Sequence, residues 1–416
     1  MISRLGALVA VVFKNLALIG MAILAFEGLL QLASIWLPAV DEKTFPPRPR
    51  LIGDPAGGYR GDPAIPEHDA LGFRNAWVPQ RAEIVALGDS HVYGSNVARE
   101  AAWPHLLAST LGRSVYNMGL PTYGVTDSFD HLDRVVGLRP RLVLLALYFG
   151  NDFFDDYRTA KARGRLPEIA DEGERGEIQR LEAERGIVRH LVDERARTEE
   201  SARPTRRDGL ARRFSLWVKS WSRVFGLLRN LYVAVAHQGS IDAREGLVAP
   251  NFEVARAAIS PAHRDFVTVH DGPRWKTLLT ARYRLQALDD RDLRIRVGAR
   301  ASLQHIARMA ARLEAAGIAF AVVLLPTKEL AIRPRVRVPE DHGPLGALIA
   351  SETRWRRKVL NFLAARNIPA IDPLPALGRA EPQPYFGNVD SHPNAKGHEV
   401  IAATVAAEIE ALGLPK

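Results

Sequence analysis

The sequence predicts an α/β fold in which helices cover both faces of a parallel sheet. Short apolar segments alternate with amphipathic helical segments along much of the chain, and several of the apolar segments end in glycine followed by polar residues. Near-continuous apolar runs are typical of parallel strands that are buried on both faces. With 416 residues, of which 47% are hydrophobic, the chain is long enough to bury a substantial core.

The chain begins with a segment that predicts a membrane-spanning helix. The stretch Leu16–Leu37 is almost wholly apolar and has the length that a helix needs to cross a bilayer. We interpret residues 1–39 as an N-terminal membrane anchor; a cleaved signal peptide and a buried core helix are the alternatives. Glu27 is costly inside a bilayer and therefore predicts a polar partner or a position near an interface. We expect the rest of the chain to be extracytoplasmic, in the periplasm.

A region rich in proline and glycine follows, and then the strands begin. Residues 40–81 read as a linker that wraps the domain surface. Beyond it, the strands are expected at the apolar runs and the helices at the amphipathic segments between them. The predicted strands are 83–88, 114–119 and 141–149, and the predicted helices are 103–111 and 126–138.

An insert interrupts this alternation at residues 158–250. Its first part is dense in charges of both signs, which suits an exposed helix or a partly disordered segment. Its second part, 210–237, predicts a basic amphipathic helix with an aromatic face. That face either packs on the domain or lies on an anionic membrane surface or a partner helix. It contains Phe214, Trp217, Trp221, Phe225, Leu228 and Tyr232.

The strand–helix alternation then resumes and completes the domain. The predicted helices are 298–316, 352–367 and 395–412, and the predicted strands are 318–326 and 368–374. We therefore expect one α/β domain made of residues 82–157 and 251–416, with the insert between its two parts.

Composition excludes several classes of site. The chain has no cysteine, which excludes disulfides, cysteine-bound zinc and thiol catalysis. The formal charge of +9 comes largely from basic residues between Arg203 and Arg229, and no nucleic-acid-binding motif accompanies them. No spacing typical of metal ligands occurs. We expect neither a metal, nor a cofactor, nor a nucleic-acid partner.

Residues suited to acyl transfer follow the predicted strands. Ser90 follows the first strand and supplies a hydroxyl that is a weak nucleophile until a base removes its proton. His392, just before the last helix, is suited to be that base, and Asp390 to orient the imidazole. His398 is a rival base, although its place at the start of a helix favours a structural role.

An oxyanion hole is predicted beside the serine. The carboxyl ends of parallel strands meet at one edge of a sheet, so their loops contribute to one site. Its donors are the backbone N–H groups of Ser90 and of the turn that contains Gly119 and Thr122, together with the side-chain amide of Asn151. Each motif alone is an ordinary turn. Their order along the chain is what favours catalysis.

These motifs resemble the SGNH (GDSL-type) hydrolase superfamily, in particular its membrane-anchored bacterial branch related to polysaccharide O-acetyltransferases. The resemblance covers residues 82–152 and 297–412, in the segments "GDSHVYG", "YNMGLPTYG", "FGND", "LLPTKE" and "DSHPNAKGH". It implies a flavodoxin-like three-layer α/β/α fold and an acyl-serine intermediate. The chain departs from the family pattern at Thr122, where a glycine is usual. It also departs at Asp390, which precedes His392 by two residues instead of three.

These observations favour a serine-dependent ester hydrolase or O-acyl(acetyl)transferase. The expected substrate is an acylated glycan of the cell envelope or an exported polysaccharide, or another ester. A lipid or thioester hydrolase at the membrane surface is a second reading. A non-catalytic glycan-binding or scaffold protein of the same fold is a third.

Overall fold

The computed structural model describes residues 2–36, 51–53, 59–185, 222–225, 227–228, 247–248, 251–264, 266–335 and 343–415. The chain forms two compact units. The first contains residues 1–49 and 189–242, and the second contains residues 50–188 and 243–416. We describe each unit by itself.

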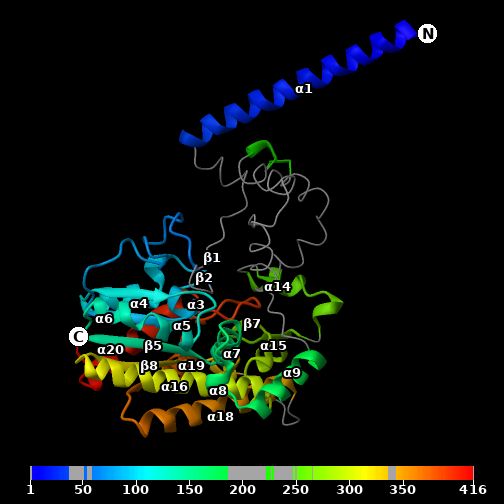
Figure 1. Cartoon of the computed structure of the whole chain (residues 1–416). Helices are drawn as coiled ribbons and strands as arrows, with labels where there is room; N and C mark the ends of the chain where they lie inside the picture. Colours follow the sequence, from blue (N-terminus) through cyan, green and yellow to red (C-terminus); the bar gives the residue numbers. More distant parts are fainter. Residues whose placement is uncertain are drawn as a thin grey trace. The chain divides into compact units, whose positions relative to one another are not determined.

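The larger unit is built on a five-stranded parallel sheet (Figure 1). Its strands are β3 (Ile84–Gly88), β4 (Val115–Gly119), β5 (Leu142–Tyr148), β8 (Ala319–Leu325) and β9 (Ala370–Ile371). They lie in the order β4-β3-β5-β8-β9, and all adjacent pairs are parallel. The chain order thus reverses between β3 and β5, which is where doubly wound sheets bind ligands.

Alternate side chains of these strands enter two separate cores. Val85 and Leu87 of β3 point into one core, whereas Ile84 and Ala86 point into the other. Such a sheet buries both faces, because successive side chains on a strand point to opposite sides. The alternation explains why the strands read as unbroken apolar runs in the sequence.

Helices cover both faces of the sheet (Figure 1). One layer contributes to the first core and consists of α5 (Val125–Asp130), α6 (Leu132–Gly137), α7 (Asp152–Ala162), α16 (Leu293–Ala315) and α18 (Pro344–Ala364). The other contributes to the second core and includes α3 (Ser90–Tyr93), α4 (Trp103–Leu111), α17 (Lys328–Ile332), α19 (Leu374–Arg379) and α20 (Ala395–Ala411). The predicted three-layer α/β/α fold is confirmed.

Three helix predictions differ from the structure. The helix expected over 298–316 begins earlier, at Leu293, because the Asp292 side chain caps it by accepting the Arg294 backbone N–H. The helix expected over 126–138 is divided at His131, whose backbone lies at φ −90°, ψ 2°. The helix expected from residue 352 begins at Pro344, because proline suits the first helical position after Gly343.

Part of the region predicted as a linker belongs to the larger unit. Strand β1 (Leu51–Gly53) pairs with β2 (Tyr59–Gly61) in an antiparallel hairpin. Phe73 is only 3% exposed and lies in the first core. The described part of residues 40–81 therefore belongs to the larger unit, whereas the sequence prediction assigned it to a linker that wraps the domain surface. Residues 37–50 and 54–58 lie outside the described residues.

The predicted insert is also divided between the two units. Its beginning extends α7 and adds α8 (Leu166–Ile169) and α9 (Glu172–Arg185) to the larger unit, where Arg300 of α16 pairs with Glu174 at 2.8 Å. Residues 189–242 group instead with the N-terminus. Most of the predicted 210–237 helix lies outside the described residues.

The remaining described elements complete the larger unit. None of them was predicted. They are α14 (Phe252–Ala257), β6 (Thr268–Asp271), β7 (Lys276–Leu279), α15 (Ala281–Gln286) and the short 3₁₀ turns Arg99–Ala101, Pro261–His263 and Arg333–Arg335. Strands β6 and β7 pair with each other as an antiparallel hairpin.

In the smaller unit, α1 spans Ile2–Trp36. Its segment Phe13–Ala33 is long and apolar enough to cross a membrane, and only 6% of its span window is buried. Within the described residues, this exposure contradicts the reading as a buried core helix. A membrane anchor and a signal sequence both fit.

Glu27 has polar partners, as the sequence predicted for an acid within this apolar helix. Its carboxylate accepts hydrogen bonds from the Ser222 hydroxyl at 2.7 Å and from the backbone N–H groups of Arg223 at 2.9 Å and Val224 at 3.0 Å. Gln31, one turn further along α1, donates to it at 2.7 Å. The acid therefore joins α1 to the segment that begins at Ser222.

Candidate active site

Ser90 stands at a tight turn from strand to helix. β3 ends at Gly88, whose φ of +146° is unfavourable for other residues. A Cβ at this position would lie 2.7 Å from a methyl carbon of Val92. Asp89 then caps α3 by accepting the His91 backbone N–H at 2.9 Å. The turn presents the half-buried Ser90 as the first residue of α3, at the carboxyl edge of the sheet.

The structure brings Ser90, His392 and Asp390 into one chain of hydrogen bonds. The Nε2 atom of His392 lies 2.8 Å from the Ser90 hydroxyl oxygen, and Nδ1 lies 2.6 Å from an oxygen of Asp390. The same Asp390 oxygen accepts the backbone N–H of His392 at 2.8 Å. The two-residue spacing therefore allows the pairing, and Val389 packs in a small apolar cluster instead.

Asp390 is held as a carboxylate. Burial acts to raise its pKa, but His392 and the Lys328 ammonium keep the pKa of Asp390 well below its usual range. Its second oxygen accepts a hydrogen bond from the Asn96 side-chain amide. Asn96 lies far from Asp390 in sequence and was not identified by sequence reasoning.

The rings of His91 and Tyr148 form a wall of the candidate site next to His392. The His91 ring lies 3.7 Å from the Tyr148 ring and 4.8 Å from the His392 ring, measured between centroids. Its Nδ1 atom lies 3.1 Å from Asp89, and burial lowers the pKa of His91 despite that carboxylate. Neither wall residue was singled out from the sequence.

Three of the four predicted oxyanion donors are available. The backbone N–H groups of Ser90 and Thr122 donate to no acceptor among the described residues. Asn151 donates one N–H of its amide to Asp155 at 2.6 Å. Because the amide has two N–H groups, the second remains for an oxyanion.

Gly119 requires a correction. Its N–H already donates to the Asn117 side chain at 2.9 Å, so it is not an available donor. A Cβ at this position would lie 2.5 Å from the Cβ of Val92. Glycine is therefore needed here because α3 packs directly against β4.

Thr122 occupies a strained backbone position. Its φ is +76°, a region that β-branched residues rarely adopt. The turn around it is held by Leu120, which donates to Gly88, and by Tyr123, which donates to Leu120, both at 3.1 Å. Strain of this kind costs roughly 1–3 kcal/mol and is concentrated at functional sites. Thr122 thus holds a backbone conformation that glycine adopts more easily than threonine.

Lys328 fixes the loop that contains Asp390 and His392. It is 1% exposed, and its ammonium donates to the backbone carbonyls of Asn388 and Asp390, both at 2.7 Å. Burial lowers the pKa of Lys328 to about 8, so it is mainly charged at neutral pH. The segment "LLPTKE" was noted in the sequence, but the lysine received no role.

Replacing Lys328 by methionine is expected to lower kcat for hydrolysis of an ester by about 10- to 100-fold. The loop loses its two hydrogen bonds to the ammonium, and a small displacement of catalytic groups has effects of this size. Labelling of Ser90 by a fluorophosphonate should slow in parallel. Lys276→Met is the control, since Lys276 is half exposed and pairs with Asp271. An unchanged kcat, with thermal unfolding as the check of folding, would show that the loop does not depend on Lys328.

His398 is a structural residue, as its position suggested. It is buried, and its Nδ1 accepts the Trp103 backbone N–H at 3.2 Å. Burial lowers the pKa of His398 to about 3, which leaves it neutral. Within the described parts of the chain, no three His, Asp or Glu side chains are arranged to hold a metal ion.

Comparison with known proteins gives one family and several solved structures. Residues 286–416 match the family described as SGNH hydrolase-like domain, acetyltransferase AlgX. A GDSL-like lipase from Bacteroides thetaiotaomicron VPI-5482 is 11% identical with a TM-score of 0.33, over 80% of this chain and 93% of that one. A member of the lipolytic protein G-D-S-L family from Veillonella parvula DSM 2008 is 10% identical with a TM-score of 0.33, over 78% and 96%. No curated protein matches.

The family match confirms the predicted relation to the SGNH hydrolases and to their acetyltransferase branch. It covers the helix–strand alternation of the C-terminal part, including the segment that contains Asp390 and His392.

Proposed function

We propose, from the SGNH hydrolase-like domain of this chain and its relation to the acetyltransferase AlgX, that the protein is a serine-dependent O-acyltransferase or ester hydrolase. The proposed substrate is an acylated, most simply acetylated, polysaccharide of the cell envelope or an exported one. The observation that carries the proposal is the hydrogen-bonded chain from Ser90 through His392 to Asp390.

The first half-reaction forms an acyl-serine. His392 Nε2 accepts the proton of the Ser90 hydroxyl as the oxygen attacks the ester carbonyl. The oxyanion is stabilised by the N–H groups of Ser90 and Thr122 and by the Asn151 amide. The leaving alkoxide then takes the proton from His392, and the acyl group stays on Ser90.

The second half-reaction repeats these steps with a new hydroxyl. Water or a sugar hydroxyl loses its proton to His392 and attacks the acyl-serine, and the Ser90 oxygen recovers the proton. Water yields a free acid, and a sugar hydroxyl yields a new ester. Asp390 stays ionised throughout and stabilises the imidazolium.

The proposal includes location. Helix α1 serves as an N-terminal membrane anchor, and the α/β unit faces the periplasm. Ser222 and the adjoining backbone bind Glu27, which supports retention of α1 as part of the folded protein. A glycan-modifying enzyme then works where envelope polysaccharides are exported.

Covalent labelling tests the proposal. The full chain in detergent should react with a fluorophosphonate at Ser90, and Ser90→Ala should abolish the label. Ser109→Ala is the control, because Ser109 is exposed on α4 and bonds only within its own helix. Acetate release from an aryl acetate, compared with transfer to an added oligosaccharide, then separates hydrolase from transferase. Absence of labelling at Ser90 would contradict both enzyme assignments.

A further inference from the structure

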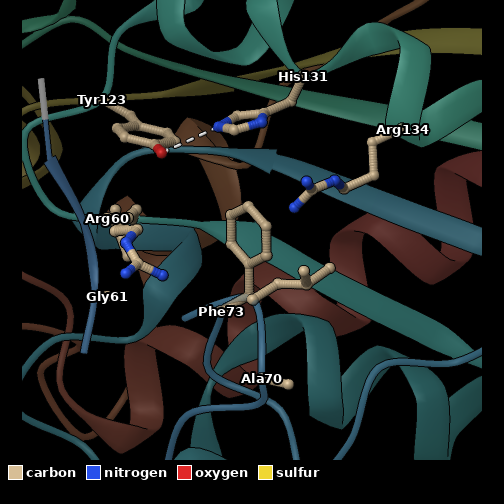
Figure 2. A pocket seen from close by; sticks show the side chains of 9 residues that line it. Arg60, Gly61, Ala70, Phe73, Tyr123, His131 and Arg134 are labelled. Carbon is tan, nitrogen blue, oxygen red and sulfur yellow. Dashed lines mark hydrogen bonds between the residues drawn. The ribbon is translucent and has the colours of Figure 1, made fainter. Parts of the chain in front are cut away.

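A cavity lies on the larger unit, beside β4. It has a volume of about 350 Å³. Its lining consists of two arginines, one histidine, one tyrosine and apolar or small residues: Arg60, Gly61, Ala70, Leu71, Phe73, Leu120, Tyr123, His131 and Arg134. No aspartate or glutamate is among these lining residues. The side chains are drawn in Figure 2.

The two arginines supply positive charge without a counter-ion. Figure 2 shows Arg60 and Arg134 on opposite sides of the Phe73 ring, with both guanidinium groups toward the cavity. Neither arginine forms an ion pair with any residue that the structure describes, whereas Arg163 pairs with Asp127 at 2.7 Å. The Nε of Arg60 is also buried without a hydrogen-bond partner. A buried donor without a partner is costly, so this arrangement indicates an anionic ligand.

The rest of the lining favours a ligand that contains a ring. The His131 and Tyr123 rings stack at 5.5 Å with an interplanar angle of 23°, and Phe73 meets His131 edge-on at 5.5 Å. A hydrogen bond of 2.9 Å joins the Tyr123 hydroxyl to His131. This aromatic wall is fixed before any ligand arrives. The cavity volume of about 350 Å³ lies near the lower end of the range of small-molecule pockets, roughly 300–1,000 Å³, and has room for one six-membered ring.

The floor of the cavity is fixed by Asp69, which lies outside the lining. Its carboxylate accepts the backbone N–H groups of Leu71 at 2.8 Å and Phe73 at 3.2 Å. It also accepts the Asn75 amide at 3.1 Å and the Tyr116 hydroxyl at 2.7 Å. These four bonds use the acceptor capacity of Asp69. Asp69 therefore holds the loop through neutral donors, and it forms no ion pair with Arg60 or Arg134.

The cavity shares a turn with the candidate active site. Leu120 and Tyr123 line the cavity, and Thr122, the candidate oxyanion donor, lies between them in sequence. A ligand in the cavity therefore contacts the turn that also serves Ser90.

We propose that this cavity binds an oxyanion attached to a sugar-sized ring. The arginines bind the anion, and Phe73, Tyr123 and His131 contact the ring. A carboxylate and a phosphate monoester share this chemistry. The proposed site does not depend on the catalytic proposal, because binding is measurable without turnover.

Calorimetric titration of the full-chain Ser90→Ala variant tests the site with three probes. Glucuronate has a carboxylate on a pyranose ring, glucose 6-phosphate has a phosphate, and glucose has neither. We expect at least one charged sugar to bind at least tenfold more tightly than glucose. Whichever binds more tightly identifies the anion.

Substitution of the arginines then assigns the binding to this cavity. Arg60→Gln and Arg134→Gln should each weaken binding of the preferred probe at least tenfold. Arg113→Gln is the matched control, because Arg113 pairs with Glu83 outside the cavity. Thermal unfolding checks that each variant folds; Arg134 is exposed, so its variant is expected to fold normally. Equal affinity for glucose and both anions, no binding of any probe, or binding that neither arginine variant weakens would overturn the proposal.

Discussion

Ser90→Ala and His392→Ala should each lower kcat/KM toward an aryl acetate by about 10⁴- to 10⁶-fold, and the double variant should lose no more than either single one. The expected non-additivity follows from the hydrogen bond of 2.8 Å between the hydroxyl and Nε2. Once the serine is gone, the imidazole has no proton to accept from it. Once the imidazole is gone, the hydroxyl remains a weak nucleophile.

Steady-state hydrolysis of the aryl ester, with the full chain in detergent, measures the three variants. His270→Ala is the control, since His270 lies on β6 and belongs to no part of the candidate site. Losses that multiply in the double variant would mean that Ser90 and His392 act independently. The chain of hydrogen bonds would then not be a catalytic unit.

The sequence predicted the positions of those candidate-site residues that lie within a few residues of a regular element. Ser90 lies two residues after the end of β3, and His392 lies three residues before the start of α20, so strand and helix prediction already located them at one edge of the sheet. The same holds for Asn151 after β5. Their positions depend on the order of elements along the chain, which the hydrophobic pattern reveals.

Two residues that contact the loop of Asp390 and His392 from elsewhere in the chain were not predicted. Asn96 reaches Asp390, and Lys328 reaches the backbone of the same loop, across large separations in sequence. Nothing local marks an asparagine or a lysine for such a contact. Gly119 shows the opposite error: a glycine at a strand end suggested a donor, whereas close packing against α3 explains it.

The sequence did not predict the cavity beside β4, because part of its lining comes from a segment whose composition is typical of a linker. Arg60 and Phe73 lie in a region rich in proline and glycine, a composition typical of linkers. The Asp69 carboxylate nevertheless fixes this segment, because it accepts hydrogen bonds both from the Phe73 backbone N–H in the same loop and from the Tyr116 hydroxyl on β4. His68 and Asn75 of the same stretch add hydrogen bonds to Tyr93 and to the backbone of Asn117, so several buried polar residues together fix it on the unit.

Asp390→Ala is expected to lower kcat by about 10⁴-fold, and Asp390→Asn is expected to be clearly less harmful. The Asp390 oxygen that faces His392 accepts two donors, the backbone N–H at 2.8 Å and Nδ1 at 2.6 Å. Both favour the oxygen of an asparagine at this position over its NH₂ group. The productive tautomer of His392 is then kept, and only the negative charge is lost.

The side chain of Asn96 is able to adapt to an asparagine at position 390. In the native chain its NH₂ group donates to the outer oxygen of Asp390. Beside an asparagine at 390, rotation of the Asn96 amide presents its oxygen to the new NH₂ group, so no two donors face each other. Asn96→Ala in the Asp390→Asn background should therefore cost less than tenfold more, because the NH₂ group then meets water. The kcat values of the native protein and of these three variants show whether Asp390 acts mainly by orienting His392 or by its negative charge. If Asp390→Asn is as slow as Asp390→Ala, the charge of Asp390 is what matters, and orientation of the imidazole by an oxygen alone is insufficient.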